Sequence, residues 1–248
     1  ESDYYPKSDK IFVVSDIHGQ YEVFRKLLYM NGIIDQDDNW TWEDGQLVLV
    51  GDIFDRGDQV HETLWLIYKL ENQAMAVGGK VHLILGNHEV MVLQNDLRYV
   101  TDKYFSISEL FEIDTPQLYG IDTFWGRWLR SKNFISTIGS TLFVHGGIHP
   151  ELITKYKSIT EINTRMRDNI DTHRDTIKND QELSDIFRSK GTIWHRGFFQ
   201  PDSLPDVSED ELTNILDHFE IYKIIVGQKT EDSIYYLKIK VLVLQILV

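Results

Sequence analysis

The stretch Gly51-Asp52-Ile53-Phe54-Asp55-Arg56-Gly57 directly follows the apolar run Leu47–Val50 and sets two carboxylates and a guanidinium between glycines. Glycine permits a tight turn at the end of a strand, and carboxylate oxygens are ligands that suit hard divalent cations. A helix-capping aspartate beside a surface ion pair would give a similar string. We favour a turn that holds metal ions and an anion at the end of a buried strand.

Two similar strings lie on either side of this stretch. Ser15-Asp16-Ile17-His18-Gly19 and Gly86-Asn87-His88-Glu89 each follow an apolar run as well. After each string the sequence has a helical pattern, and in the first helix Val23, Leu27 and Leu28 are expected to face inward. Strand, polar turn and helix thus alternate three times, which predicts parallel strands with crossover helices at 21–30, 60–71 and 90–97. Ligands bind beyond the carboxyl ends of such strands, so the strings should meet at one edge.

The rest of the chain predicts helices and a second set of strands. Residues 101–132 are rich in aromatic side chains, and we expect a helical cap with its own small core there in preference to a substrate platform. Residues 158–188 are polar with a helical pattern. The last strands follow one another without helices, so part of the sheet should be antiparallel; strands are expected at 141–144, 222–226, 234–237 and 240–248. We expect one domain, 1–248, with a helical insertion around 98–135.

Composition excludes several kinds of partner and chemistry. The net charge of −14 does not suit nucleic-acid backbones. The chain has no cysteine, which excludes disulfides, thiolate ligands and a cysteinyl-phosphate intermediate. No run reaches the roughly 18 apolar residues of a membrane helix.

The chain begins at Glu1 without Met, which suggests a cleaved signal peptide or a trimmed chain, so we favour a periplasmic or secreted location over a cytoplasmic one. The sequence indicates no oligomeric state.

Taken together, the strings resemble the signature of the calcineurin-like metallophosphoesterases and, more narrowly, of the phosphoprotein phosphatases. That signature is Gly-Asp-x-His-Gly, Gly-Asp-x-x-Asp-Arg-Gly, Gly-Asn-His-Glu and a later His-Gly-Gly, which here starts at His145, while Ser15 replaces the first glycine. The resemblance runs from about Lys10 to Gly227. The strings at 57–60 and 89–94 are similar to those of bacterial Shewanella-like phosphatases, and the Ser-Ala-Pro-Asn-Tyr signature of eukaryotic serine/threonine enzymes is absent.

The resemblance implies an α/β fold, a sandwich of mixed β-sheets flanked by helices. It also implies two divalent metal ions, with manganese expected first and iron or zinc as alternatives. Asp16 and His18 would hold the first metal ion, and Asp52 would bridge the two. Asn87 and His145 would hold the second.

The same resemblance implies catalytic and substrate-binding roles. His88 would protonate the leaving oxygen, and Asp55 would fix the orientation of its ring. Arg56 would bind the phosphoryl oxygens, because a guanidinium matches phosphate geometry. The string Trp194-His195-Arg196-Gly197 is similar to the segment that supplies a second phosphate-binding arginine, here Arg196.

One position departs from the family pattern. The last ligand of the family is a histidine in a Gly-His-Thr-like turn, where this chain has Gln228. An amide oxygen is a weaker ligand for a transition metal than an imidazole. Three explanations stay open: the second metal ion binds weakly, water or another group such as His195 or His218 completes its shell, or the residue is a misassigned histidine. We favour the last, because the other ligands are intact.

The implied activity is hydrolysis of phosphate monoesters on a phosphorylated protein or peptide, by direct attack of a metal-bridging water. A diadenosine-polyphosphate hydrolase is an alternative, because those enzymes share the core motifs. A non-catalytic binding protein with a degraded metal site is another. His88, Asp55 and Arg56 argue against it, since a binding module needs no acid for a leaving group. The sequence does not choose among phosphoserine, phosphothreonine and phosphotyrosine.

Overall fold

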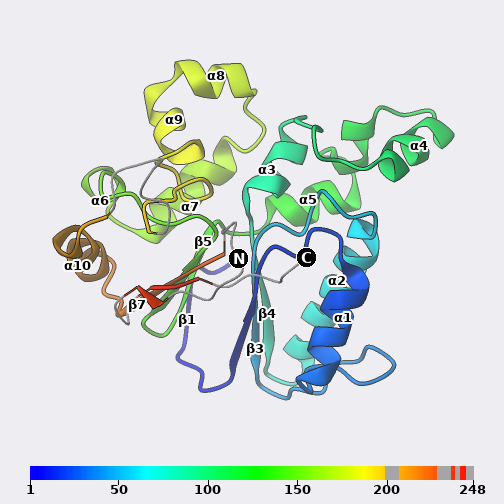
Figure 1. Ribbon diagram of the computed structural model, residues 1–248, viewed down its shortest axis with the longest axis horizontal. Helices are drawn as coiled ribbons and strands as arrows, with labels where there is room; N and C mark the ends of the chain where they lie inside the picture. Colours follow the sequence, from blue (N-terminus) through cyan, green and yellow to red (C-terminus); the bar gives the residue numbers. More distant parts are fainter. Residues whose placement is uncertain (199–206, 228–235, 238–240, 244–248) are drawn as a thin grey trace.

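The protein forms two β-sheets that pack face to face, with helices on their outer sides (Figure 1). The structure, a computed structural model, describes residues 1–198, 207–227, 236–237 and 241–243. The first sheet is parallel and consists of β2 (Ile11–Val14), β3 (Gln46–Val50) and β4 (Lys80–Ile84). The second sheet has the order β1-β5-β6-β7-β9-β8, and these strands are Tyr4–Tyr5, Ile135–Ile138, Thr141–Val144, Lys223–Val226, Val241–Val243 and Tyr236–Leu237.

The helices follow the strands in the predicted order. α1 packs on α2, and α2 packs on β4. The helices of the described residues are α1 (Tyr21–Met30), α2 (Val60–Ala76), α3 (Asn87–Leu93), α4 (Asp102–Leu110), the 3₁₀ helix η1 (Thr115–Tyr119), α5 (Phe124–Arg130), α6 (Leu152–Lys155), α7 (Ile159–Asp168), α8 (Arg174–Asn179), α9 (Gln181–Phe187) and α10 (Glu209–His218). None of them combines the length and apolar character needed to cross a bilayer.

The predicted fold class is confirmed. The three strand-turn-helix units form the parallel sheet β2-β3-β4, as the alternation predicts. The later strands include the antiparallel pairs β5–β6 and β8–β9, so the second sheet is mixed.

The strand β3 is apolar throughout because both of its faces are buried. Leu47 and Leu49 belong to the core beneath the helices, whereas Val48 and Val50 belong to a second apolar cluster between the sheets. Successive side chains of a strand point to opposite faces, so a strand in the middle of a layered fold needs apolar residues at every position. This double burial fixes the position of the turn that follows Val50.

Two details of the predicted core are wrong. In α1, Val23 is 46% exposed and the larger Phe24 is fully buried, four residues before the buried Leu28. The aromatic segment forms helices, but its side chains join the main core, where the ring of Tyr119 lies edge-on to Phe54 at 5.0 Å. Amphipathic spacing identifies a face only to within about one residue, and it does not show which core a face joins.

The neighbouring residues of α1 provide a matched test of this packing. Phe24→Ala should lower the free energy of unfolding by about 3–5 kcal/mol, because it removes a buried ring and leaves a cavity. Val23→Ala, on the exposed face, should change it by no more than about 0.5 kcal/mol. Chemical denaturation of both variants measures the difference, and equal losses would show that the face is assigned wrongly.

Candidate metal centre

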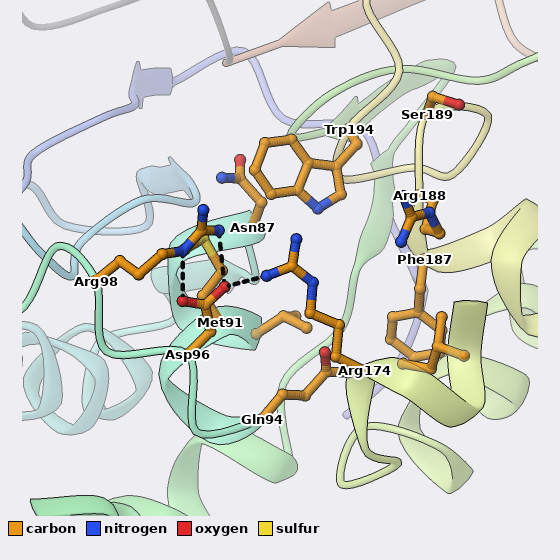
Figure 2. A pocket seen from close by; sticks show the side chains of 12 residues that line it. Asn87, Met91, Gln94, Asp96, Arg98, Arg174, Phe187, Arg188, Ser189 and Trp194 are labelled. Atoms are coloured by element: carbon orange, nitrogen blue, oxygen red, sulfur yellow. Dashed lines mark hydrogen bonds and ion pairs between the residues drawn. The ribbon is translucent and has the colours of Figure 1, made fainter. Parts of the chain in front are cut away.

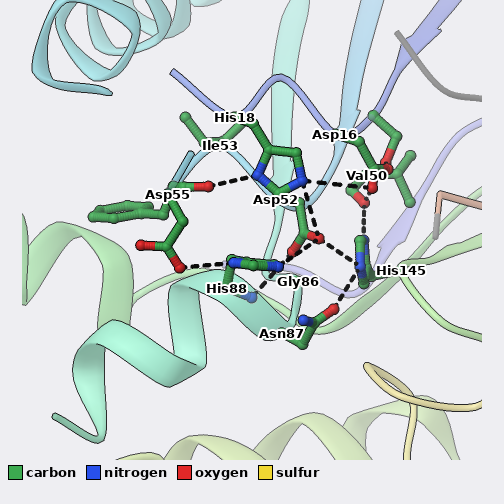
Figure 3. A network of polar contacts seen from close by, with 12 residues as sticks. Asp16, His18, Val50, Asp52, Ile53, Asp55, Gly86, Asn87, His88 and His145 are labelled. Atoms are coloured by element: carbon green, nitrogen blue, oxygen red, sulfur yellow. Dashed lines mark hydrogen bonds and ion pairs between the residues drawn. The ribbon is translucent and has the colours of Figure 1, made fainter. Parts of the chain in front are cut away.

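The candidate site lies at the carboxyl ends of four strands. Asp16 follows β2, Asp52 follows β3, Asn87 opens α3 after β4, and His145 follows β6 directly. All four side chains are buried and point toward one another (Figure 3). The turns that the sequence places beyond the strand ends do meet at one edge.

The turns after β2 and β3 have an unusual backbone. Asp16, His18, Asp52, Asp55 and Arg56 have φ values of 55°, 48°, 57°, 68° and 64°, and they are half of the non-glycine residues with positive φ in the described part of the chain. Each such residue costs roughly 1–2 kcal/mol. The two turns support each other, since the His18 N–H donates to the Asp52 carbonyl at 2.9 Å. Strain of this kind concentrates at functional sites.

Asp52 is the centre of the cluster. Its Oδ2 lies 3.2 Å from His145 Nε2, 3.8 Å from His18 Nε2 and 3.9 Å from His88 Nε2. Two groups of side chains in the described residues have the spacing to hold a metal ion, and Asp52 belongs to both. The groups are His18, Asp52 and His88, and Asp16, Asp52 and His145.

The imidazole rings are oriented as ligands by backbone carbonyls. His18 Nδ1 donates to the Phe54 carbonyl and His145 Nδ1 to the Val50 carbonyl, each at 2.7 Å. A carbonyl only accepts a hydrogen bond, so Nδ1 bears the proton in both rings and Nε2 presents a lone pair to the site. Partners of this kind fix the ring and its tautomer before a metal ion arrives.

The ring nitrogen Nε2 of His145 faces two oxygen atoms, and this arrangement of three lone pairs is suited to binding a cation. Its Nε2 faces Asp52 Oδ2 at 3.2 Å and the Asn87 amide oxygen at 3.0 Å, and neither oxygen can donate. A proton or a metal ion between them removes the repulsion. Burial opposes charge on His145, but Asp52 stabilises the protonated ring and raises its pKa to about 9.

Burial makes the remaining charges costly. Burial and the neighbouring Asp52 raise the pKa of Asp16 to about 7. Burial also opposes ionisation of Asp52, yet the charge of His145 holds its pKa well below the usual range. Burial lowers the pKa of His18 to about 4, which keeps the ring neutral and available as a ligand. Two buried carboxylates, the neutral imidazole of His18 and an amide oxygen fit a divalent cation, which would take the place of the proton on His145 Nε2.

His88 belongs to one of these groups and also pairs with Asp55 at the edge of the cluster. His88 Nδ1 donates to Asp55 Oδ2 at 2.7 Å, which leaves Nε2 facing the site. Burial disfavours the protonated ring, but the hydrogen bond to Asp55 and the negative charges of Asp52 and Asp55 together outweigh burial and raise the pKa of His88. The ring of Tyr99 lies 5.4 Å from that of His88 and borders the approach to it.

The two arginines of the predicted site lie within electrostatic range of its titratable side chains. Arg56 is exposed next to Asp55, and Arg196 is partly buried. Burial lowers the pKa of Arg196, Asp52 and Asp16 raise it, and Arg56 lowers it. The guanidinium of Arg196 therefore lies within electrostatic range of both carboxylates and of Arg56.

Sequence reasoning gave no role to Glu89. Its fully buried carboxylate accepts hydrogen bonds from the backbone N–H groups of Asp52 at 2.9 Å, Ile53 at 2.6 Å, Phe54 at 3.1 Å and Gly86 at 2.7 Å. An acidic residue at the capping-box position of a short helix was the available signal, but it indicates only the bond to Gly86. The other three bonds depend on the packing of one turn against another.

The turn expected to carry the last ligand begins beside the site. The Gly227 N–H donates to the His145 carbonyl at 2.9 Å, and a side chain at Gly227 would meet the hydroxyl of Ser15. Gln228 itself lies outside the described residues. The substitutes considered for it do not join either ligand group of the described chain: His218 donates to the Tyr156 carbonyl, and His195 packs against aromatic rings.

Metal binding should stabilise the fold. A divalent ion such as Mn²⁺ at about 100 times its Kd should add about 2.7 kcal/mol to the unfolding free energy of chelated protein, and thereby raise Tm by roughly 5–10 °C. Asp52→Asn should abolish most of the shift, because it removes the charge shared by both ligand groups. Asp9→Asn, at a side chain 92% exposed, should keep it. A full shift in Asp52→Asn, measured by calorimetry, would place the bound metal elsewhere.

Comparisons with known proteins agree with this geometry. A family model described as calcineurin-like phosphoesterase matches residues 9–235. The chain is 29% identical to Shewanella-like protein phosphatase 1 of Plasmodium berghei (strain Anka), over 94% of this chain and 66% of that protein. It is 28% identical to Shewanella-like protein phosphatase 2 of Arabidopsis thaliana, over 60% of this chain and 49% of that protein. It therefore spans just under two thirds of the first relative and half of the second.

A solved structure matches nearly the whole chain. It is the cold-active protein-tyrosine phosphatase of a psychrophilic Shewanella species, with a TM-score of 0.92 and 42% identity, over 98% of this chain and 73% of that one. At this similarity the two chains share the same fold.

Proposed function

Because the chain belongs to the calcineurin-like phosphoesterase family, we propose that it hydrolyses phosphate monoesters on proteins or peptides with the help of two divalent metal ions. The hydrogen bond of His88 Nδ1 to Asp55, at the edge of the cluster around Asp52, carries this proposal. His88 has the spacing of a metal ligand, but its pairing with a carboxylate suits a proton donor, and we assign it that role. A protein that only binds metal needs the ligand groups, whereas a hydrolase also needs a proton donor for the leaving oxygen. The names of the Shewanella-like relatives and of the Shewanella tyrosine phosphatase support a phosphorylated protein as substrate.

In this proposal Asp16, His18 and Asp52 hold the first metal ion, and Asp52, Asn87 and His145 hold the second. The mixture of carboxylate, imidazole and amide ligands suits manganese, with iron or zinc as alternatives. Asp16 Oδ1 lies 4.0 Å from His18 Nε2, a separation that one ion can span. Bound metal ions would lower the pKa of a water molecule and neutralise the charge of the phosphoryl oxygens. Gln228 or a group in its place would complete the second shell.

The side chains of the protein provide binding and the proton. Arg56 and Arg196 bind the phosphoryl oxygens through charge-assisted hydrogen bonds. The leaving alkoxide is a strong base, and the proton on His88 Nε2 neutralises it as the bond to phosphorus breaks. Asp55 stabilises the imidazolium and holds the ring in place. Because the pKa of His88 is raised, the ring is protonated over more of the neutral pH range and loses activity as an acid only when pH rises through that pKa.

Replacement of the proton donor tests its role directly. His88→Asn should lower kcat by roughly 10²–10⁴-fold with little change in KM, because the proton is transferred in the transition state. The loss should shrink for aryl phosphates with acidic leaving groups, which need less protonation. Steady-state kinetics over a series of leaving groups measures this, and an equal loss across the series would contradict the role of His88 as the acid.

The activity itself is tested by substrate choice and by chelation. The protein should hydrolyse phosphopeptides and p-nitrophenyl phosphate, lose both activities on exhaustive chelation and recover them with Mn²⁺, because bound metal ions would activate water and neutralise the phosphoryl charge. Full activity in metal-free protein would exclude the two-metal mechanism. A much higher kcat/KM for diadenosine tetraphosphate than for any phosphopeptide would favour the alternative of a diadenosine-polyphosphate hydrolase.

A further inference from the structure

A cavity of about 310 Å³ adjoins the candidate metal centre (Figure 2). The proposed ligand Asn87 lies in its wall, so the cavity and the metal centre share a border. The proposed chemistry assigns no role to it. Its lining includes apolar side chains from α3, α8, α9 and the segment before Arg196, which are Val90, Met91, Ile177, Phe187 and Trp194.

The charged side chains of the cavity are mostly positive. Arg98, Arg174 and Arg188 line it together with a single carboxylate, Asp96. Asp96 accepts hydrogen bonds from Arg98 Nε at 2.7 Å and Nη2 at 2.8 Å, and from Arg174 Nη1 at 3.0 Å. Three positive charges and one negative charge give the cavity lining a net charge of +2, although the net charge of the whole chain is −14. We call this site the arginine cavity.

Arg188 is an arginine of the cavity that the described part of the chain leaves without a partner. Its side chain is exposed and makes no hydrogen bond or ion pair with any described residue, whereas Arg98 and Arg174 both bind Asp96. The bonds through Asp96 hold the loop after α3 against α8. Arg98 and Arg174 therefore have a structural role, whereas these bonds give no such role to Arg188.

The arginine cavity is joined to the proton donor through one loop. The guanidinium of Arg98 lies over the ring of Tyr99 at 5.5 Å, and that ring lies 5.4 Å from the ring of His88. The Tyr99 carbonyl accepts a hydrogen bond from the Arg56 N–H at 3.0 Å. A peptide whose phosphoryl group reaches His88 and Arg56 therefore passes close to the cavity.

We propose that the arginine cavity binds an acidic side chain of the substrate, an aspartate or glutamate close in sequence to the phosphorylated residue. The inference rests on the proposed function, because it assumes a phosphopeptide substrate. The apolar lining suits the aliphatic part of such a side chain, and the guanidinium of Arg188 suits its carboxylate. A bare phosphate monoester does not need these arginines, since Arg56 and Arg196 already face the metal centre.

Phosphopeptides that differ at one position test the proposal. A phosphotyrosine peptide is made with Glu, Gln or Lys at each position within about four residues of the phosphotyrosine, a reach of about 13 Å in an extended chain. At one or more positions the wild-type protein should prefer Glu over Gln by about two- to fivefold in kcat/KM, the range of an exposed charge pair. The preference should weaken at high salt, because exposed charges are screened.

Variants assign the preference to Arg188. In Arg188→Gln the ratio of kcat/KM for the Glu and Gln peptides should fall to about one, and in Arg188→Glu the Lys peptide should become the better substrate. A ratio taken within one variant removes any effect of the substitution on the chemical step. Lys26→Gln, which removes a positive charge from an exposed position of α1, should keep the wild-type ratio.

The outcomes separate this inference from the proposed function. If phosphopeptides are hydrolysed with no preference for Glu at any position, or if the preference survives in Arg188→Gln, the arginine cavity does not bind the acidic side chain, and the phosphatase proposal stands. If p-nitrophenyl phosphate is hydrolysed and no phosphopeptide is, the proposed action on proteins is wrong, and this inference is overturned with it.

Discussion

The candidate metal centre depends on one buried carboxylate that binds no metal in our proposal. Glu89 accepts hydrogen bonds from three consecutive residues of the turn after β3 and from Gly86 after β4, and so joins the two turns. Burial and the nearby charge of Asp52 raise the pKa of this group, and the backbone donors offset only part of the increase. A buried carboxylate is tolerated when its acceptors are fully used, and such a network is rigid. The strained turn of Asp52 can persist because Glu89 binds it from outside the cluster.

The close approach of these turns explains the glycine at position 86. A Cβ atom there would lie 2.3 Å from Asp52 Oδ1 and 2.7 Å from the Asp52 backbone nitrogen. Any other residue would push the central carboxylate out of place or separate the turns. The Gly-Asn-His-Glu string therefore combines a close contact at Gly86 and a carboxylate at Glu89 that holds the neighbouring turn with the two residues to which we assign a ligand and a proton donor, Asn87 and His88.

Sequence reasoning succeeded where the signal is local. The apolar runs, the glycines and the polar turns predict parallel strands and place Asp16, Asp52 and Asn87 at one edge, because a strand end is defined by the residues next to it. It did not find the carbonyls of Val50 and Phe54 that orient the imidazoles, since carbonyls are present at every residue and only packing selects two of them. The face of α1 was off by one residue for a related reason, because side-chain size decided between Phe24 and Val23.

The arginine cavity has no local signal at all. Its three arginines, Arg98, Arg174 and Arg188, come from separate segments of the sequence, and the net charge of the whole chain is negative, opposite in sign to that of the cavity. An acidic protein repels an anionic phosphopeptide at long range, but charges in solution are screened beyond about 8–10 Å, so recognition depends on positive groups close to the substrate.

Metal ions determine the sign of this local field. Without them, the charge of Asp52 is balanced by the protonated ring of His145, the raised pKa of Asp16 favours its neutral form, and Arg56 and Arg196 are nearby cations. Two divalent ions would make the cluster positive and add to the attraction of the arginines. In our proposal the metal ions displace the proton of His145 and ionise Asp16, and the phosphorylated substrate then meets a site that the metal ions have made positive.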